Sequence, residues 1–86
     1  MINYTYEDFE RELDKSGLRD QFSSADMALA KKNANAGMSL LNYKIDYNNA
    51  TTDEQRMLAN QGAEEIRLKY GSYYAGSDGS KYYYKE

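Results

Sequence analysis

The sequence predicts an all-α protein with a long antiparallel helix pair, a shorter N-terminal helix and a tyrosine- and glycine-rich C-terminal turn or small hairpin. Three observations support this prediction. The 86 residues contain no proline, a residue that interrupts helices. Apolar side chains recur at spacings of three and four along three segments. Residues typical of helix starts and ends bound each segment. A chain of this length forms one small core, so we expect a single domain over residues 1–86.

The first helix is predicted over residues 5–16. Thr5 is its N-cap, and Asp8 three positions later completes a variant of the capping box. The apolar face consists of Tyr6, Phe9 and Leu13. Gly17 is expected to end the helix in the left-handed conformation, which glycine adopts without steric cost.

The second helix is predicted over residues 24–48, after a cap at Ser23 or Ser24. One apolar face runs along its whole length through Met27, Ala30, Ala34, Met38, Leu41 and Ile45. The segment "NNATT" then breaks the helix, because asparagine tolerates a helix exit and threonine caps the next start. The sequence therefore predicts one long, uninterrupted helix here.

The third helix is predicted over residues 52–70. Its start is marked by Thr51 with Glu54, or by Thr52 with Gln55, as a capping box. The apolar face consists of Ala59, Ala63, Ile66 and Tyr70, and Gly71 ends the helix. Two glycines, Gly37 and Gly62, are nearly equidistant from the turn, which predicts that the helices approach closely there. The alternative is that they only loosen an exposed face.

The C-terminal segment, residues 71–86, contains five of the ten tyrosines, and Tyr70 directly precedes it. Its Asp-Gly pair is a turn signal between two short runs of strand-forming tyrosines, which indicates a small hairpin. The tyrosines concerned are Tyr73, Tyr74, Tyr82, Tyr83 and Tyr84. They either cover the small core as a lid or form a binding surface, because tyrosine provides rigid contact area. A disordered tail is the third interpretation.

Composition excludes several classes of chemistry. The chain has no cysteine and no histidine, so disulfides, thiolate nucleophiles and the usual zinc ligands are absent. The glycine-rich end lacks the lysine of a phosphate-binding loop, and Asp78 lacks the further acidic ligands of a calcium loop. Glu64 and Glu65 are adjacent on a helix and point in different directions, so they do not form an acid and base pair. We expect no enzyme activity, cofactor or metal.

Charge is distributed unevenly along the chain. Seven acidic and three basic residues lie before residue 27, against seven acidic and eight basic residues after it. An acidic N-terminal third argues against direct nucleic-acid binding, which needs a cationic surface. No segment is apolar enough to span a membrane, and the first residues do not resemble a signal peptide. We therefore expect a soluble, cytoplasmic protein.

The first helix carries like charges at i,i+4, which are mildly unfavourable in an isolated helix. Most such faces are only solvated, but a minority bind arginine- or lysine-rich protein surfaces. Together with exposed tyrosines, they could imitate the charge and stacking of a nucleic acid. The predicted partner-binding residues are Glu7, Glu10, Asp14, Tyr73, Tyr74, Tyr82, Tyr83 and Tyr84.

The segment "LLNYKIDYNNATTDEQRMLANQGAEEIRLKYGSYYAGSDGSKY" resembles a short helical module that recurs in phage-related and cell-wall-associated proteins of Firmicutes. The matching residues are Lys44, Asp46, Tyr47, Ala50, Arg56, Ala59, Ala63, Glu64, Ile66, Arg67, Tyr70, Gly71, Tyr74, Gly76, Asp78, Gly79, Ser80 and Tyr82. The preceding "YTYEDFERELDKSGL" is similar to segments that precede this module in phage structural proteins. Ser72 and Ala75 depart from the pattern, which has glycine at both positions.

The resemblance implies a phage or prophage protein without catalytic activity, acting in the host cytoplasm. Within that setting the acidic helix and the tyrosines favour an inhibitor that masks a host defence protein, such as a nucleic-acid-binding nuclease, as anti-CRISPR proteins do. The alternative is a structural or assembly module of a phage particle or cell-surface protein, which would bind itself or neighbouring proteins. Self-association is compatible with either function.

Overall fold

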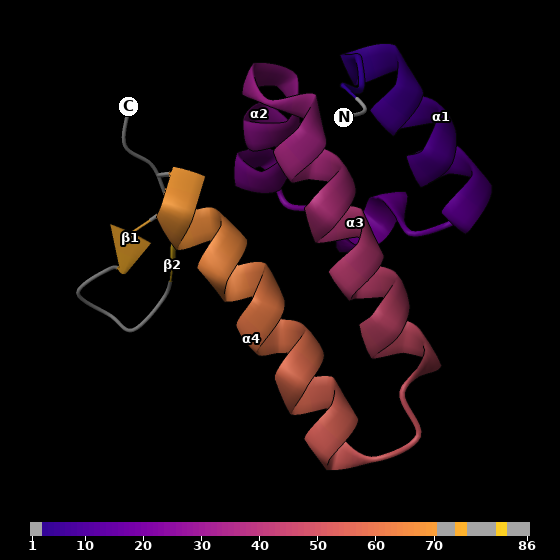
Figure 1. Cartoon of the computed structure of the whole chain (residues 1–86), viewed down its shortest axis with the longest axis vertical. Coiled ribbons are helices and arrows are strands. Elements are labelled where there is room, and N and C mark those ends of the chain that lie inside the picture. Colours follow the sequence, from indigo (N-terminus) through magenta and orange to yellow (C-terminus); the bar gives the residue numbers. More distant parts are fainter. Residues whose placement is uncertain (1–2, 71–73, 76–80, 83–86) are drawn as a thin grey trace.

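The computed structural model describes residues 3–70 and, as backbone, residues 74–75 and 81–82. The predicted all-α class is confirmed, since almost all of the described residues are helical (Figure 1). The elements are α1 (Tyr6–Ser16), the 3₁₀ turn η1 (Arg19–Gln21), α2 (Ser24–Lys32), α3 (Ala34–Asn49), α4 (Asp53–Tyr70), β1 (Tyr74–Ala75) and β2 (Lys81–Tyr82).

Both ends of α1 follow the sequence signals. The Thr5 hydroxyl accepts a hydrogen bond from the Asp8 N–H, and the Asp8 carboxylate accepts one from the Thr5 N–H, which is a complete capping box. Gly17 ends the helix with φ of 72°, in the left-handed region. Phe9 and Leu13 are fully buried and direct α1 onto the core.

The prediction of one uninterrupted helix over residues 24–48 is wrong, because the structure divides this segment into two helices at Asn33. Asn33 has an extended backbone, with φ of −147° and ψ of 97°. Its N–H donates to the Leu29 carbonyl at 2.7 Å, and its side-chain oxygen accepts from the Ala36 N–H at 3.1 Å. One asparagine thus ends α2 and caps α3, since its side chain competes with helical backbone bonding. The continuous apolar pattern hid this break.

Replacing Asn33 with alanine should lower the free energy of unfolding by about 1 kcal/mol, the usual loss for an N-cap. The Ala36 N–H would lose its partner, although alanine is the better helix former. Chemical denaturation measures the change. Asn42→Ala, at an exposed position within α3, is the matched control and should not destabilise the protein. A stability gain for Asn33→Ala would contradict the capping role.

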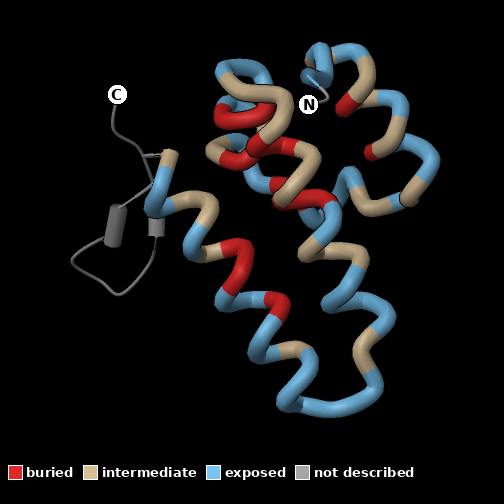
Figure 2. Tube along the Cα trace, in the orientation of Figure 1, coloured by how far each residue is buried: buried red, intermediate tan, exposed pale blue. Residues whose placement is uncertain are grey.

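Helix α4 runs antiparallel to α3 after the turn at residues 50–52, and α1 lies beside α3 on the other side (Figure 1). The described core lies mainly where α1, α2 and the first half of α3 meet (Figure 2). Its buried members are Phe9, Leu13, Phe22, Leu29, Ala30, Ala36, Leu40, Leu41 and Ala63. α4 contributes mostly small residues to this core, which lets its backbone lie close to α3.

The two helical glycines make separate close contacts. A Cβ added at Gly37 would lie 2.5 Å from the Ala30 Cβ and 3.1 Å from a Phe9 ring carbon. A Cβ added at Gly62 would overlap the Tyr43 ring instead. Both glycines are therefore in close packing, as expected, but Gly37 serves the α2–α3 contact and Gly62 admits a tyrosine of α3.

At the C-terminal end, β1 and β2 pair antiparallel, with Tyr74 opposite Tyr82 and Ala75 opposite Lys81. The turn of the predicted hairpin, residues 76–80, lies outside the described residues. The same holds for the side chains of the tyrosines predicted as a lid or binding surface.

Candidate functional site

The predicted acidic residues lie together on α1. Glu7, Glu10 and Asp14 are spaced by three and four, so they share one side of the helix, away from the buried Phe9 and Leu13. Glu7 and Asp14 are exposed, and Glu10 is half-buried. We call these three residues the acidic face of α1.

One cation partly neutralises the acidic face. Arg19, in η1, donates from Nε and Nη2 to Asp14 Oδ1 at 3.1 and 3.0 Å, and its Nη2 lies 3.8 Å from Glu10 Oε2. The hydrogen bond and charge of Asp14 raise the pKa of Arg19. Two acids therefore share one base, and none of the ion pairs within residues 3–70 involves Glu7. Sequence reasoning missed this contact because Arg19 lies between the first two predicted helices, outside their periodic patterns.

The other charges of α1 form short ion pairs along the helix. Arg11 Nη1 lies 3.2 Å from Asp8 Oδ1, and Lys15 Nζ lies 3.6 Å from Glu12 Oε2. The backbone N–H of Thr5, then Arg11, lower the pKa of Asp8. These pairs are off the acidic face, so the net negative charge of α1 concentrates at Glu7, Glu10 and Asp14.

The predicted tyrosine surface is described only in part, through the backbone of Tyr74 and Tyr82. Tyr74 and Tyr82 are brought opposite one another by the β1–β2 pairing. Their side chains, and Tyr73, Tyr83 and Tyr84, lie outside the described residues. Among the tyrosines that are described with side chains, Tyr4 and Tyr47 are exposed.

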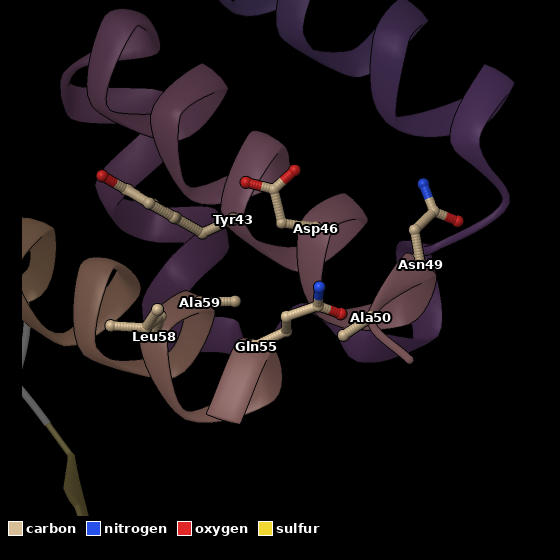
Figure 3. A pocket seen from close by; sticks show the side chains of 7 residues that line it. All are labelled: Tyr43, Asp46, Asn49, Ala50, Gln55, Leu58 and Ala59. Carbon is tan, nitrogen blue, oxygen red and sulfur yellow. The ribbon is translucent and has the colours of Figure 1, made fainter. Parts of the chain in front are cut away.

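An open groove of about 390 Å³ lies between α3 and α4 near their turn (Figure 3). It is lined by Tyr43, Asp46, Asn49, Ala50, Gln55, Leu58 and Ala59. Asp46 is its single carboxylate, and Gln55 is already engaged by the Thr51 N–H at 2.8 Å. Beside Asp46, the phenol of Tyr43 is the other titratable group of this lining, and we describe the groove as an open surface feature.

A buried ion cluster joins three helices and was not anticipated. Asp26 on α2 is only 2 % exposed. Arg67 on α4 binds it through two parallel hydrogen bonds, from Nε and Nη2, both at 2.8 Å. Lys44 Nζ on α3 lies 4.0 Å from Asp26 Oδ2, and Glu64 accepts from Arg67 Nη1 at 3.1 Å. The paired geometry fixes α4 against α2, because a guanidinium matches a carboxylate in one orientation.

The surroundings of the cluster shift the pKa values of its bases. Burial lowers the pKa of Lys44, with the Arg67 charge adding to the effect and Asp26 opposing it. Burial also opposes the charge of Arg67, but its hydrogen bonds to Asp26 and Glu64 prevail and raise its pKa. Charged Lys44 thus costs folding free energy at neutral pH, and this cost disappears as the pH rises toward its usual pKa of 10.5. We interpret the cluster as structural.

Two further features of the described residues bear on function. No group of acidic side chains among them could hold a metal ion. No helix among them is both long and apolar enough to cross a membrane.

Comparison with known proteins gives no match: no protein-family model, curated protein or solved structure is significantly similar to this chain.

Proposed function

We propose that this chain is a non-enzymatic binding protein that engages a basic protein partner through the acidic face of α1. The observation that carries the proposal is the charge imbalance on that face: within residues 3–70, Arg19 is the one base that forms ion pairs with any of its three carboxylates. Complementary charge accelerates encounter with a basic surface and fixes its orientation.

The position of α1 supports this role. The helix lies at the edge of the molecule, on the far side of α3 from α4 (Figure 1). It is anchored by Phe9 and Leu13, and its outer side is open to solvent along Glu7 and Asp14. A partner could therefore cover the acidic face without disturbing the core.

The finer form of the proposal is a phage-encoded inhibitor that acts in the host cytoplasm. A nucleic-acid-binding nuclease of host defence has the required basic surface, because it must neutralise phosphates. The acidic face would occupy this surface in place of nucleic acid. The α3–α4 pair serves as the scaffold in this proposal, and the tyrosine-rich C-terminal segment adds rings that could stack as bases do.

Neutralising the acidic face should abolish partner capture without unfolding the protein. We expect Glu7→Gln/Glu10→Gln to leave the free energy of unfolding within about 0.5 kcal/mol of the wild type, because the one ion pair affected is on the surface. In affinity capture from bacterial lysate, followed by mass spectrometry, the wild type should retain a basic protein at low salt. The variant should not retain it.

Asp46→Asn/Asp53→Asn is the matched control, since it removes the same charge at exposed positions on α3 and α4. It should capture the partner as the wild type does. Raised salt should release the partner, because contacts between exposed charges are screened. Equal capture by the two variants, or capture that is insensitive to salt, would contradict the proposed binding face.

A further inference from the structure

Helix α4 exposes large apolar side chains on the side away from α3. Leu58 is 61 % exposed and Leu68 is 66 % exposed, and neighbouring Met57 is 63 % exposed. Gln61 and Glu65 lie between the two leucines on the same side and are also exposed. We call Leu58, Gln61, Glu65 and Leu68 the outer stripe of α4. These three large apolar side chains, exposed on one helix, make α4 a candidate contact surface.

The outer stripe has the spacing of a coiled-coil seam. Its residues are separated by three, four and three positions, which are the steps between successive a and d positions of a heptad. The order leucine, polar, polar, leucine is the same in both directions. In an antiparallel pair a positions meet d positions, so Leu58 would meet Leu68 of a second copy. Gln61 would then meet Glu65 and could donate a hydrogen bond to its carboxylate.

Charge along α4 favours the same arrangement. Its first turn carries Asp53 and Glu54, and its last turn carries Arg67 and Lys69. Arg67 is bound to Asp26, so Lys69 is the base of the last turn that is exposed. Antiparallel pairing about a centre near residue 63 brings the first turn of one helix beside the last turn of the other. Glu54 of one copy then lies within reach of the long side chain of Lys69 of the other. A parallel pair would instead place like charges together at both ends.

We propose that α4 is a self-association surface, through which two copies of this chain pair antiparallel about a two-fold axis. Such an isologous contact is closed, so it gives a dimer and no filament. The leucine-to-leucine stretch spans roughly 15 Å, which makes a smaller contact than a standard interface. We therefore expect a dimer that dissociates on dilution. Since α1 lies at the opposite edge of the molecule, the dimer presents two acidic faces (Figure 1).

Sedimentation velocity of the purified full chain over a wide concentration range tests the proposal. The wild type should pass from monomer to dimer. Leu58→Gln/Leu68→Gln should raise the dissociation constant about tenfold or more, since apolar contact area is lost at both ends of the seam. Lys69→Glu should also weaken the dimer, and adding Glu54→Lys to it should restore the wild-type constant. Lys32→Glu, the same charge reversal at an exposed site on α2, should leave it unchanged.

Spin labels test the orientation. Because the chain has no cysteine, Met57→Cys takes one label at a defined site. In the proposed dimer residue 57 lies opposite residue 69, so the two labelled backbone sites are roughly 20 Å apart, against roughly 10 Å in a parallel pair. A monomer at every concentration, a dimer unaffected by the leucine variant, or the shorter distance would overturn the proposal. None of these results bears on the acidic face of α1.

Discussion

Replacing Arg67 with methionine is expected to lower the free energy of unfolding by about 3 kcal/mol, the loss typical of breaking a buried ion pair. Asp26 would stay buried but lose both of its 2.8 Å hydrogen bonds. Lys44 at 4.0 Å would compensate only in part, because it is too distant for a short hydrogen bond. Equilibrium denaturation in urea measures the change.

Two control variants distinguish the buried pair from a general effect of losing an arginine. Asp26→Leu/Arg67→Met should recover most of the lost stability, because apolar residues can replace a buried pair at little cost. Arg11→Met removes the partner of Asp8 on the surface of α1 and should cost less than about 1 kcal/mol. If Arg67→Met were as mild as Arg11→Met, the cluster would not hold α4 against α2.

Gly37→Ala is expected to destabilise the protein by about 2 kcal/mol, even though alanine is the better helix former by about 1 kcal/mol. The added methyl group would lie 2.5 Å from the Ala30 Cβ and 3.0 Å from the Ala30 Cα. Backbone atoms of α2 cannot move aside without shifting the whole helix. Thermal or urea denaturation measures the loss.

Gly62→Ala provides the matched comparison within the neighbouring helix. The three atoms nearest to its methyl group would all belong to the Tyr43 ring. Tyr43 is half-buried, so its side chain can rotate away. The gain in helix propensity should then offset most of the cost, leaving a change below about 1 kcal/mol. Equal losses of stability from the two substitutions would show that the α2–α3 contact at Gly37 is no tighter than the α3–α4 contact at Gly62.

Local signals in the sequence predicted the fold where neighbouring residues decide the structure. The Thr5 capping box, the Gly17 exit and the all-α class all depend on contacts within a few positions. The break at Asn33 was missed because the apolar spacing continues across it, and only the packing of α2 on α3 decides that its side chain caps a new helix. A periodic pattern cannot distinguish a straight helix from two helices joined at one residue.

The candidate site was likewise predicted only in part from the spacing of residues. Spacing alone placed Glu7, Glu10 and Asp14 on one side of α1. It could not reveal that Arg19 folds back onto this side, nor that Asp26 meets Arg67 across 41 positions of sequence. In the charge count, Asp26 is one of the seven acidic residues before residue 27, with no sign that it would be buried. The first pairing depends on how the chain turns after Gly17, and the second depends on tertiary structure, for which a single sequence carries no local signal.

In the proposed function, the acidic face of α1 occupies the nucleic-acid site of a basic protein. Fluorescence anisotropy of a labelled oligonucleotide bound to the captured partner, titrated with this chain, tests this proposal directly. The account predicts that the wild type displaces the oligonucleotide, whereas Glu7→Gln/Glu10→Gln does not. An anisotropy that stays unchanged while the wild type binds the partner would contradict it.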